Sequence, residues 1–331
     1  MHLRRISATL IGLLILSGAV LYSAPAAAPG GPAAEGEHLV FFLPSKESAI
    51  FNQIDLLCKT IGKKIGVPVK MMTVADIPIK NPTMAQLVKW AKSQVEKKAI
   101  DMTVVTPTGL FSIMDENIKF MPIATYEIDK KKTDRPCIFV KRGSPYTKLA
   151  GDAEKIAALK GKRVGIGHGV KSNPVADMLL LDHGINTPSF KYFDIVGTFG
   201  GVEDKLKDTV AGRLEGFITM KVDLKFLFNK NKQYADTIEP LVCGNEYTNM
   251  PFIVRDGLDP EIVGKLRKVF LTMHKDKDFA QMHFLFYAVN GHFTPVTMDD
   301  YKNWETVYKK GRKEGWLDEI GQMILPGEKS H

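Results

Sequence analysis

The chain has 331 residues, of which 44% are apolar and 25% are charged, a composition typical of a folded globular protein. Its formal net charge of +8 comes from 45 basic and 37 acidic residues. The lysines are spread along helical faces and loops without the interleaved aromatic residues of a single-strand binder, which argues against a nucleic-acid partner.

The first 26 residues have the pattern of a secretory signal peptide. Arg4 and Arg5 precede an apolar run over residues 6–22, and Ala24, Pro25 and Ala26 supply the small residues that a signal peptidase needs. The alternative is an uncleaved anchor, for which the run is short, because a spanning helix needs about 20 apolar residues. We therefore expect residues 1–26 to be removed on export and residues 27–36 to form a spacer.

Strands and helices alternate along residues 37–128. Residues 38–43 are too apolar for a strand with one solvated face, so this strand should be buried on both sides. A helix with apolar residues at helical spacing follows and ends at Gly66. Thr83 and Gln86 form a capping box for the next helix. With further strands at residues 67–72 and 100–105, this order predicts a parallel-type sheet with helices on its faces.

A second α/β unit follows, with a different sequence. Residues 121–128 and 136–140 are predicted to be extended, strands are expected at 163–167, 192–196 and 216–220, and helices at 173–183 and 202–211. The chain ends with strands at 237–242 and 251–254 and helices at 259–274, 278–288 and 297–310. We predict a lobe 1 of residues 37–128 and 241–331, including the C-terminal helices, and a lobe 2 of residues 129–240.

The three cysteines are Cys58, Cys137 and Cys243, so at most one disulfide can form within the chain. Each lies in or beside an apolar segment, which favours small buried side chains over reactive thiols. A bond between Cys137 and Cys243 is compatible with their positions, but the sequence does not establish it.

A glycine-rich turn after the strand at residues 163–167 is the strongest local signal for ligand binding. The next helix opens at Asn173, with Pro174 in its first turn, and its unpaired backbone N–H groups suit an anion. Gly165, Gly167 and Gly169 have the spacing of neither a dinucleotide turn nor a Walker loop.

No catalytic motif stands out. His274, His283 and His292 are nine residues apart, which is not metal-ligand spacing on a helix, and there is no nucleophile elbow. We predict a protein that is not an enzyme and uses neither a cofactor nor a metal.

Several segments resemble one family in their order and spacing. They are residues 159–166, the turn of Ser172, Asn173 and Pro174, and residues 204–217, 250–255, 258–267 and 293–301. Together they look like the periplasmic phosphate/phosphite/phosphonate-type substrate-binding proteins of ABC transporters. The resemblance implies an α/β, two-lobed venus-flytrap fold in the periplasm. It also implies a monomer that closes on a small ligand and presents it to a membrane permease.

The resemblance places ligand contacts on turns at the carboxyl ends of strands. In lobe 2 these are Lys171, Ser172 and Asn173, although helix capping explains the same residues equally well. The other candidates are Ser45, Lys46, Thr106, Thr108 and Phe111 in lobe 1, Tyr126 and Glu127 where the chain first crosses between the lobes, and Thr198 and Phe199 in lobe 2. For Glu127, a surface carboxylate beside neighbouring lysines is slightly favoured.

The chain departs from the family pattern in its polar residues. Thr198 and Phe199 stand where a Ser-His turn is usual, and Phe111 stands about where phosphonate binders carry a tyrosine. A site for a dianion needs its hydrogen bonds intact, because each unpaired buried polar group costs about 1 to 3 kcal/mol.

Two ligand classes therefore stay open. One is an oxyanion such as a phosphonate; the other, slightly favoured by the altered site, is a more apolar molecule such as a lipid or sterol. Core packing is nevertheless the commoner fate of phenylalanine. An alternative function for the same fold is a ligand-sensing module for a membrane receptor kinase.

Overall fold

The computed structural model describes residues 38–43, 48–79, 84–115, 117–128, 130–166, 174–197, 201–282 and 292–317. The chain divides into two compact units. One contains the segment Pro136–Gly244, which we call the inserted unit; the described residues on both sides of it form the outer unit. None of the helices in the described ranges combines the length and apolar character needed to cross a membrane.

The outer unit contains a six-stranded sheet in the order β13-β4-β12-β3-β1-β2. The strands are β1 (Leu39–Leu43), β2 (Val69–Thr73), β3 (Met102–Val104), β4 (Phe120–Tyr126), β12 (Pro251–Arg255) and β13 (Phe293–Thr294). β1 pairs in parallel with β2 and β3, whereas β12 pairs antiparallel with β3 and β4. The sheet is therefore mixed, with a strand from beyond the inserted unit at its centre.

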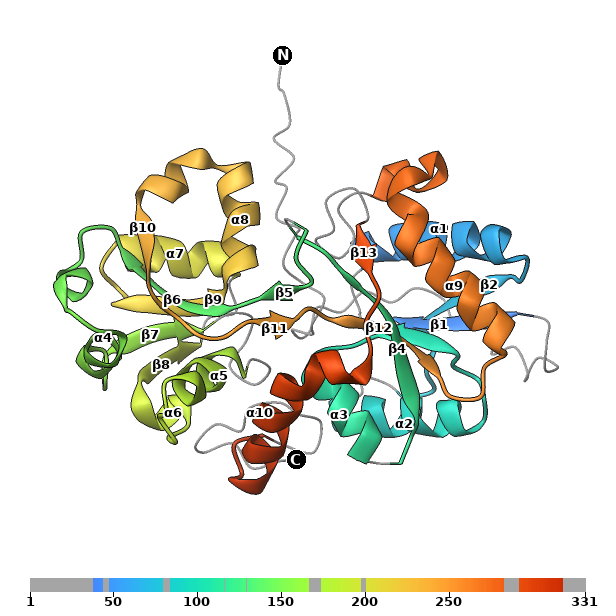
Figure 1. The fold of residues 1–331 in the computed structure, drawn as a ribbon, viewed down its shortest axis with the longest axis horizontal. Coiled ribbons are helices and arrows are strands. Elements are labelled where there is room, and N and C mark those ends of the chain that lie inside the picture. Colours follow the sequence, from blue (N-terminus) through green and yellow to red (C-terminus); the bar gives the residue numbers. More distant parts are fainter. Residues whose placement is uncertain are drawn as a thin grey trace, which may run out of the picture. The chain divides into compact units, whose positions relative to one another are not determined.

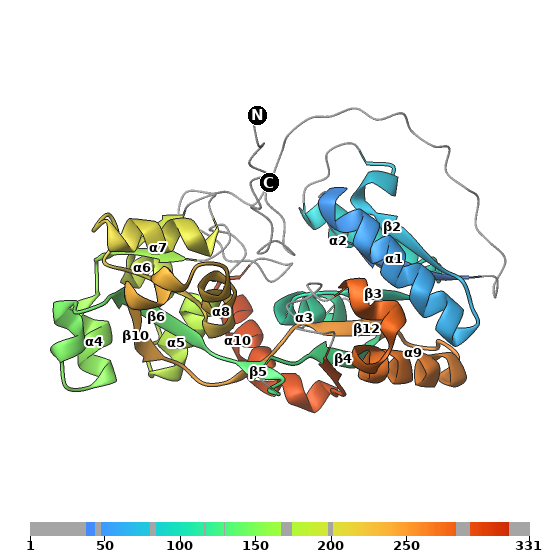
Figure 2. The same ribbon diagram turned by 90° about the horizontal axis from the view of Figure 1, so that it is seen from above.

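Helices cover both faces of this sheet (Figure 1, Figure 2). α1 (Ser48–Ile65) and α9 (Pro260–Thr272) lie side by side on one face, with α2 (Met84–Glu96) and α3 (Pro107–Asp115) on the other. Phe41 of β1 lies near Phe252, and the next residue, Phe42, contacts Trp90 of α2, with ring centroids 5.7 Å apart. This confirms that the first strand is buried on both sides.

Two predicted helices near the C-terminus differ in detail. The helix expected at residues 278–288 is a 3-10 helix, Lys277–Met282, within the described residues, and the rest of that range lies outside them. The helix expected at 297–310 starts as the 3-10 turn Met298–Tyr301 and continues as α10 (Lys302–Lys313). Thr297 and Asp300 form a capping box that holds this turn.

The inserted unit has a five-stranded sheet in the order β10-β6-β9-β7-β8. The strands are β6 (Pro136–Lys141), β7 (Arg163–Ile166), β8 (Asp194–Gly197), β9 (Gly216–Met220) and β10 (Ile238–Cys243). β7, β8 and β9 run in parallel, while β6 and β10 form an antiparallel edge. The expected strand at residues 192–196 starts later, because Tyr192 ends the short helix α6 (Ser189–Tyr192).

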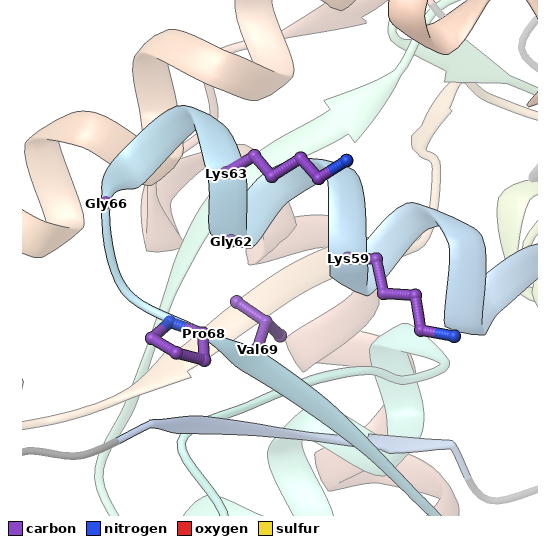
Figure 3. Close-up of a pocket in the computed structure, with 6 residues that line it drawn as sticks. All are labelled: Lys59, Gly62, Lys63, Gly66, Pro68 and Val69. Carbon is purple, nitrogen blue, oxygen red and sulfur yellow. The ribbon is translucent and has the colours of Figure 1, made fainter.

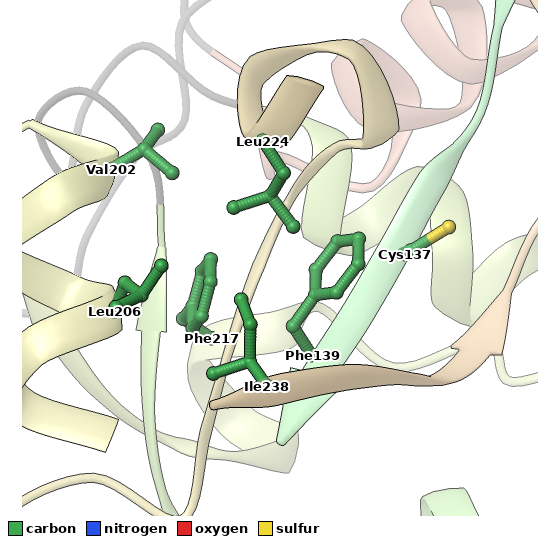
Figure 4. Close-up of a cluster of buried hydrophobic side chains, with 7 residues drawn as sticks. All are labelled: Cys137, Phe139, Val202, Leu206, Phe217, Leu224 and Ile238. Carbon is green, nitrogen blue, oxygen red and sulfur yellow. The ribbon is translucent and has the colours of Figure 1, made fainter. Parts of the chain in front are cut away.

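The helices α7 (Val202–Val210) and α8 (Lys221–Lys230) lie on one face of this sheet, and α5 (Val175–Asp182) and α6 lie on the other (Figure 1). A further helix, α4 (Asp152–Ala158), precedes β7. Figure 4 shows the core beneath α7 and α8, where the rings of Phe139 and Phe217 stack with centroids 5.6 Å apart. Val202, Leu206 and Leu224 cover them from the helices.

A disulfide joins Cys137, near the start of the inserted unit, to Cys243, near its end. The bond spans 106 residues, so nearly the whole inserted unit forms one covalently closed loop. Cys58 is a free cysteine buried in α1, and burial raises the pKa of its thiol to about 12. This supports the interpretation of Cys58 as a packing residue.

A short two-stranded sheet in the outer unit lies next in sequence to both chain connections. It pairs β5 (Thr133–Asp134) with β11 (Tyr247–Thr248). The Glu246 carboxylate accepts hydrogen bonds from Thr133 and Arg135 beside it, and these bonds hold its pKa at about 2. A charged side chain thus ties the two connecting segments together.

Candidate ligand-binding site

The carboxyl ends of β1, β3 and β4 share one edge of the outer sheet. β1 is parallel to β3, and both β3 and β4 are antiparallel to β12, so all three strands point the same way. Ligands of open α/β sheets bind at such an edge. The predicted residues Thr106, Thr108, Tyr126 and Glu127 lie at or directly after these strand ends.

Two threonine hydroxyls come together where β3 leads into α3. The Thr106 hydroxyl accepts a hydrogen bond from the Gly109 N–H at 3.0 Å, which caps the helix, and it lies 3.4 Å from the Thr108 hydroxyl. A β-carbon at Gly109 would lie 2.9 Å from the Thr106 hydroxyl oxygen, so glycine permits this close approach. The carboxyl end of β3 is therefore polar.

Phe111 lies one turn further along α3 and is buried, as Thr108 is at 3% exposure. It is 5% exposed, and its ring stacks on Tyr308 of α10 with centroids 6.0 Å apart. Tyr308 in turn donates a hydrogen bond to the Asp115 carboxylate at 2.7 Å. Phe111 packs in the core between α3 and α10, and a ligand contact by this residue stays a prediction.

Tyr126 and Glu127 end β4. Tyr126 is buried, and its carbonyl accepts a hydrogen bond from the Asn249 side chain at 3.1 Å. Glu127 is partly buried, and its N–H donates to the His292 carbonyl at 2.8 Å. These contacts position the backbone at the strand end, and a role of either side chain in binding stays a prediction.

A histidine pair that the sequence did not suggest lies beside Glu127. The rings of His274 and His292 stack with centroids 4.3 Å apart. Burial lowers the pKa of His274, the positive charges of His292 and Lys275 lower it further, and the Glu127 carboxylate opposes them. Helical spacing could not reveal the pair, because β13 brings His292 to this place through sheet pairing. No group of three or more potential metal ligands occurs in the described part of the chain.

The other predicted contact residues lie outside the described residues. They are Ser45, Lys46, Lys171, Ser172, Asn173, Thr198 and Phe199. The strands before them, β1, β7 and β8, end at Leu43, Ile166 and Gly197. Contact of any of these residues with a ligand stays a prediction.

Sequence reasoning missed three ionisable side chains in the first turns of α5, α7 and α8. Asp177 and Lys205 are 2% and 0% exposed, and Asp223 is partly buried. Lys205 follows Val202 and precedes Leu206 on the buried face of α7. A lysine at a core-facing position of an amphipathic helix is the signal that could have identified it.

A surface hollow lies elsewhere, between the end of α1 and the start of β2 (Figure 3). Lys59 and Lys63 extend from α1 above Pro68 and Val69. Lys59 is already paired with the Asp55 carboxylate at 2.6 Å. Because β2 begins at Val69, the hollow is at the amino edge of the sheet, away from the strand ends where ligands bind.

Known structures share this fold. A Xanthomonas citri protein bound to ATP has a TM-score of 0.58 and 14% identity, covering 84% of this chain and 98% of that one. PhnD1 of Prochlorococcus marinus in complex with methylphosphonate has a TM-score of 0.58 and 19% identity over the same shares. A binding-protein component of a Pseudomonas aeruginosa ABC phosphonate transporter has a TM-score of 0.56 and 13% identity, covering 83% and 87%.

No curated protein sequence matches this chain. The family model for the periplasmic substrate-binding protein of phosphonate ABC transporters matches residues 40–301. This match and the shared fold confirm the predicted family and the predicted two-lobed α/β class. The chain belongs to the family of periplasmic phosphonate substrate-binding proteins of ABC transporters.

Proposed function

We propose that this protein captures a small phosphorus oxyanion, such as an alkylphosphonate, and delivers it to the permease of an ABC transporter. Family membership supports solute binding in the periplasm and a membrane permease as partner. The related structures with methylphosphonate and with ATP support a ligand that carries phosphorus-bound oxygens.

Residues after β3 in the outer unit support an anion over an apolar ligand. Of the predicted contacts near β3, the hydroxyls of Thr106 and Thr108 lie at the carboxyl end of the strand, while the ring of Phe111 is covered by Tyr308. Thr108 is as buried as Phe111, at 3% and 5% exposed, whereas Thr106 is partly buried. The neighbouring hydroxyls at this strand end support an oxyanion, and the stacking of Phe111 on Tyr308 supports a packing role for its ring.

Thermal unfolding of the exported protein tests the proposal. One ligand series contains phosphate, phosphite and methylphosphonate, and the other contains sterols and fatty acids in detergent. A ligand at about 100 times its Kd should stabilise the protein by about 2.7 kcal/mol, which raises the unfolding midpoint measurably. We expect a shift with the oxyanions alone.

A shift with the apolar series alone would overturn the oxyanion proposal and restore the lipid or sterol alternative. If the oxyanions shift the unfolding midpoint, a matched pair of variants tests where they bind. Ser172→Ala should weaken oxyanion binding, whereas Phe199→Leu, which keeps an apolar side chain, should leave it nearly unchanged. Equal binding by both variants and the unmodified protein would exclude Ser172 as a contact.

A further inference from the structure

Lys205 is a fully buried lysine, with 0% of its surface exposed. It is the fourth residue of α7, and its neighbours on the buried face are Val202, Leu206 and Thr209. Lysine is almost never fully buried unless it is paired, because removing an ammonium group from water is costly. The free-energy cost of burying this ammonium group is expected to be offset by interacting partners or retained because of a function.

The strand beneath α7 leaves space for the lysine stem. A β-carbon added at Gly165 of β7 would lie 3.2 Å from Cδ of Lys205 and 2.9 Å from a methyl group of Leu214. The stem therefore occupies the volume that a side chain at residue 165 would fill. Since Ile166 ends β7, the lysine crosses the strand next to its carboxyl end.

Asp223, in the first turn of the neighbouring helix α8, is a carboxylate whose charge acts on Lys205. The Thr219 hydroxyl, near the carboxyl end of β9, donates a hydrogen bond to the Asp223 carboxylate. Burial raises the pKa of Asp223 to about 6, although the hydrogen bonds from Thr219 and Met220 and the charge of Lys205 lower it. Asp223 is partly exposed, whereas Lys205 and Thr219 are buried.

Burial and the surrounding carboxylates act on the charge of Lys205 in opposite directions. Burial lowers its pKa to about 8, against the opposing effect of Asp204, Asp208 and Asp223. Lys205 is fully buried, so its charge acts through a medium of low polarity. An additional negative charge nearby would therefore interact strongly with the ammonium group.

The position of the cluster is that of a ligand site. β7 and β9 are parallel, and the first turns of α7 and α8 lie at the same carboxyl edge of the inserted sheet. We propose that Lys205 makes this edge selective for anions, and that Asp223 is the counterion that limits how much of the charge a bound ligand experiences. The inference rests on the proposed function, because it concerns the same solute.

The alternative is a pair that serves stability alone. In that case removing either partner weakens the fold, and anion affinity changes in the same direction for both variants. A selectivity role predicts opposite directions, because Lys205→Met removes the attractive charge and Asp223→Asn removes the competing one.

The experiment is calorimetric titration of the exported protein with methylphosphonate and with phosphite at pH 6.5, where Lys205 is protonated. Lys205→Met should weaken binding at least tenfold, and Asp223→Asn should strengthen it about threefold or more. Lys207→Met is the matched control, because Lys207 is exposed on the same helix and pairs with Glu203 at 2.9 Å. Its affinity should stay within twofold of the unmodified protein.

A second readout is proton uptake. At pH 8, titrations in two buffers of different protonation enthalpy should show that the unmodified protein takes up protons on binding, since a bound anion raises the pKa of Lys205. If Lys205→Met does not fold, the pH dependence of oxyanion affinity in Asp223→Asn tests the role of Lys205 instead. Its affinity should begin to fall at a lower pH than in the unmodified protein, because the counterion no longer supports the charge of Lys205.

The outcomes separate the two proposals. If the unmodified protein binds no oxyanion, the proposed function falls and this inference falls with it. If the unmodified protein binds and Lys205→Met binds equally well, or Asp223→Asn weakens binding as Lys205→Met does, only the role of Lys205 is overturned. An unchanged pH profile in Asp223→Asn has the same consequence.

Discussion

The two units bury their charges at opposite edges of their sheets. In the outer unit, the Arg255 guanidinium donates to the Asp101 carboxylate at 2.7 Å, and the Val40 N–H donates to the same carboxylate at 2.8 Å. Asp101 precedes β3 and Arg255 ends the antiparallel β12, so this pair lies at the amino edge. In the inserted unit, Lys205 and Asp223 lie at the carboxyl edge.

The two sets of buried charges differ in how burial affects them. Asp101 and Arg255 satisfy each other and join three strands, as expected of a structural pair. The inserted unit contains Asp177 and Lys205, whose pKa values are shifted toward neutrality by burial. Perturbed ionisable groups of this kind concentrate at functional sites. The position of Lys205 at the carboxyl edge therefore supports the role proposed for it.

The sequence provides separate probes for the two units. Its three tryptophans, Trp90, Trp304 and Trp316, all belong to the outer unit. Intrinsic tryptophan fluorescence therefore follows the unfolding of that unit. Hydrogen exchange measured by mass spectrometry on peptides from Pro136–Gly244 follows the inserted unit.

The largest effect should come from breaking the compensated pair. Asp101→Asn leaves the Arg255 guanidinium buried without a full negative charge, and breaking a buried ion pair costs about 3 to 5 kcal/mol. Urea unfolding followed by tryptophan fluorescence should show this loss in the outer unit.

The matched control is Glu261→Gln, which breaks an exposed pair with Lys265 in the same unit. Exposed pairs contribute about 0 to 1 kcal/mol, so this variant should unfold almost as the unmodified protein does. Similar losses in the two variants would show that burial of the Asp101 pair is not the source of its effect.

The next effect concerns the disulfide of the inserted unit. Replacing Cys137 and Cys243 together by alanine removes a link across 106 residues, which should cost about 2 to 4 kcal/mol through the greater freedom of the unfolded chain. Hydrogen exchange in the inserted unit should accelerate accordingly.

The tryptophan transition of the outer unit serves as the internal control, because no outer-unit residue lies inside the closed loop. A larger loss of stability in the outer unit than in the inserted unit would contradict this assignment of the bond.

Asp177→Asn should stabilise the inserted unit at neutral pH. One carboxylate oxygen accepts from the Ser189 N–H at 2.6 Å, and the other is buried with no partner among the described residues. Burial raises the pKa of Asp177 from 3.8 to about 6, so the folded state loses stability as the pH rises between these values. The amide removes this charge and should increase stability by about 1 to 3 kcal/mol above pH 6.

Hydrogen exchange of α5 at pH 4.5 and pH 7.5, corrected for intrinsic rates, checks this. The gain in stability of Asp177→Asn over the unmodified protein should be larger at pH 7.5. Asp152→Asn, on the exposed start of α4, is the control and should change little at either pH. A gain that does not depend on pH would show that the charge of Asp177 is not its cause.

The smallest effect is the pH response of the histidine pair. The pKa of His274 is lowered in the folded state, so the unfolded chain binds the proton more readily. Its contribution to stability is complete above the unfolded pKa near 6.5 and declines as the pH falls below that value. His274→Gln should reduce the dependence of outer-unit stability on pH between 7 and 5, by about 1 kcal/mol or less. An unaltered pH dependence in this variant would remove the role of His274.

Much of the fold could be predicted because local patterns matched the tertiary context. β9 occupies the predicted residues 216–220, and α1 ends before Gly66, whose φ of 77° suits glycine at a helix end. The strand expected at 192–196 was predicted to begin too early because residues 189–192 form α6, whose first N–H is bound by Asp177 of α5. No local pattern contains that contact.

The candidate site was less predictable for the same reason. Threonines after β3 could be placed at a strand end, because strand direction and turn residues are local features. Thr219 and Asp223 are four residues apart and meet locally, but Lys205 belongs to α7, and only the packing of α7 on the sheet brings it near them. Similarly, His274 and His292 meet because β13 pairs with β4.

The sequence by itself determined the family, the α/β alternation and the turns at which polar residues follow buried strands, since these depend on periodicity, capping residues and motif order. The tertiary structure decided that Cys137 bonds to Cys243, that Phe111 packs in the core, and that a lysine is buried at the carboxyl edge of the inserted sheet. These outcomes depend on which distant segments pack together, and burial sets the energetic consequence of each contact.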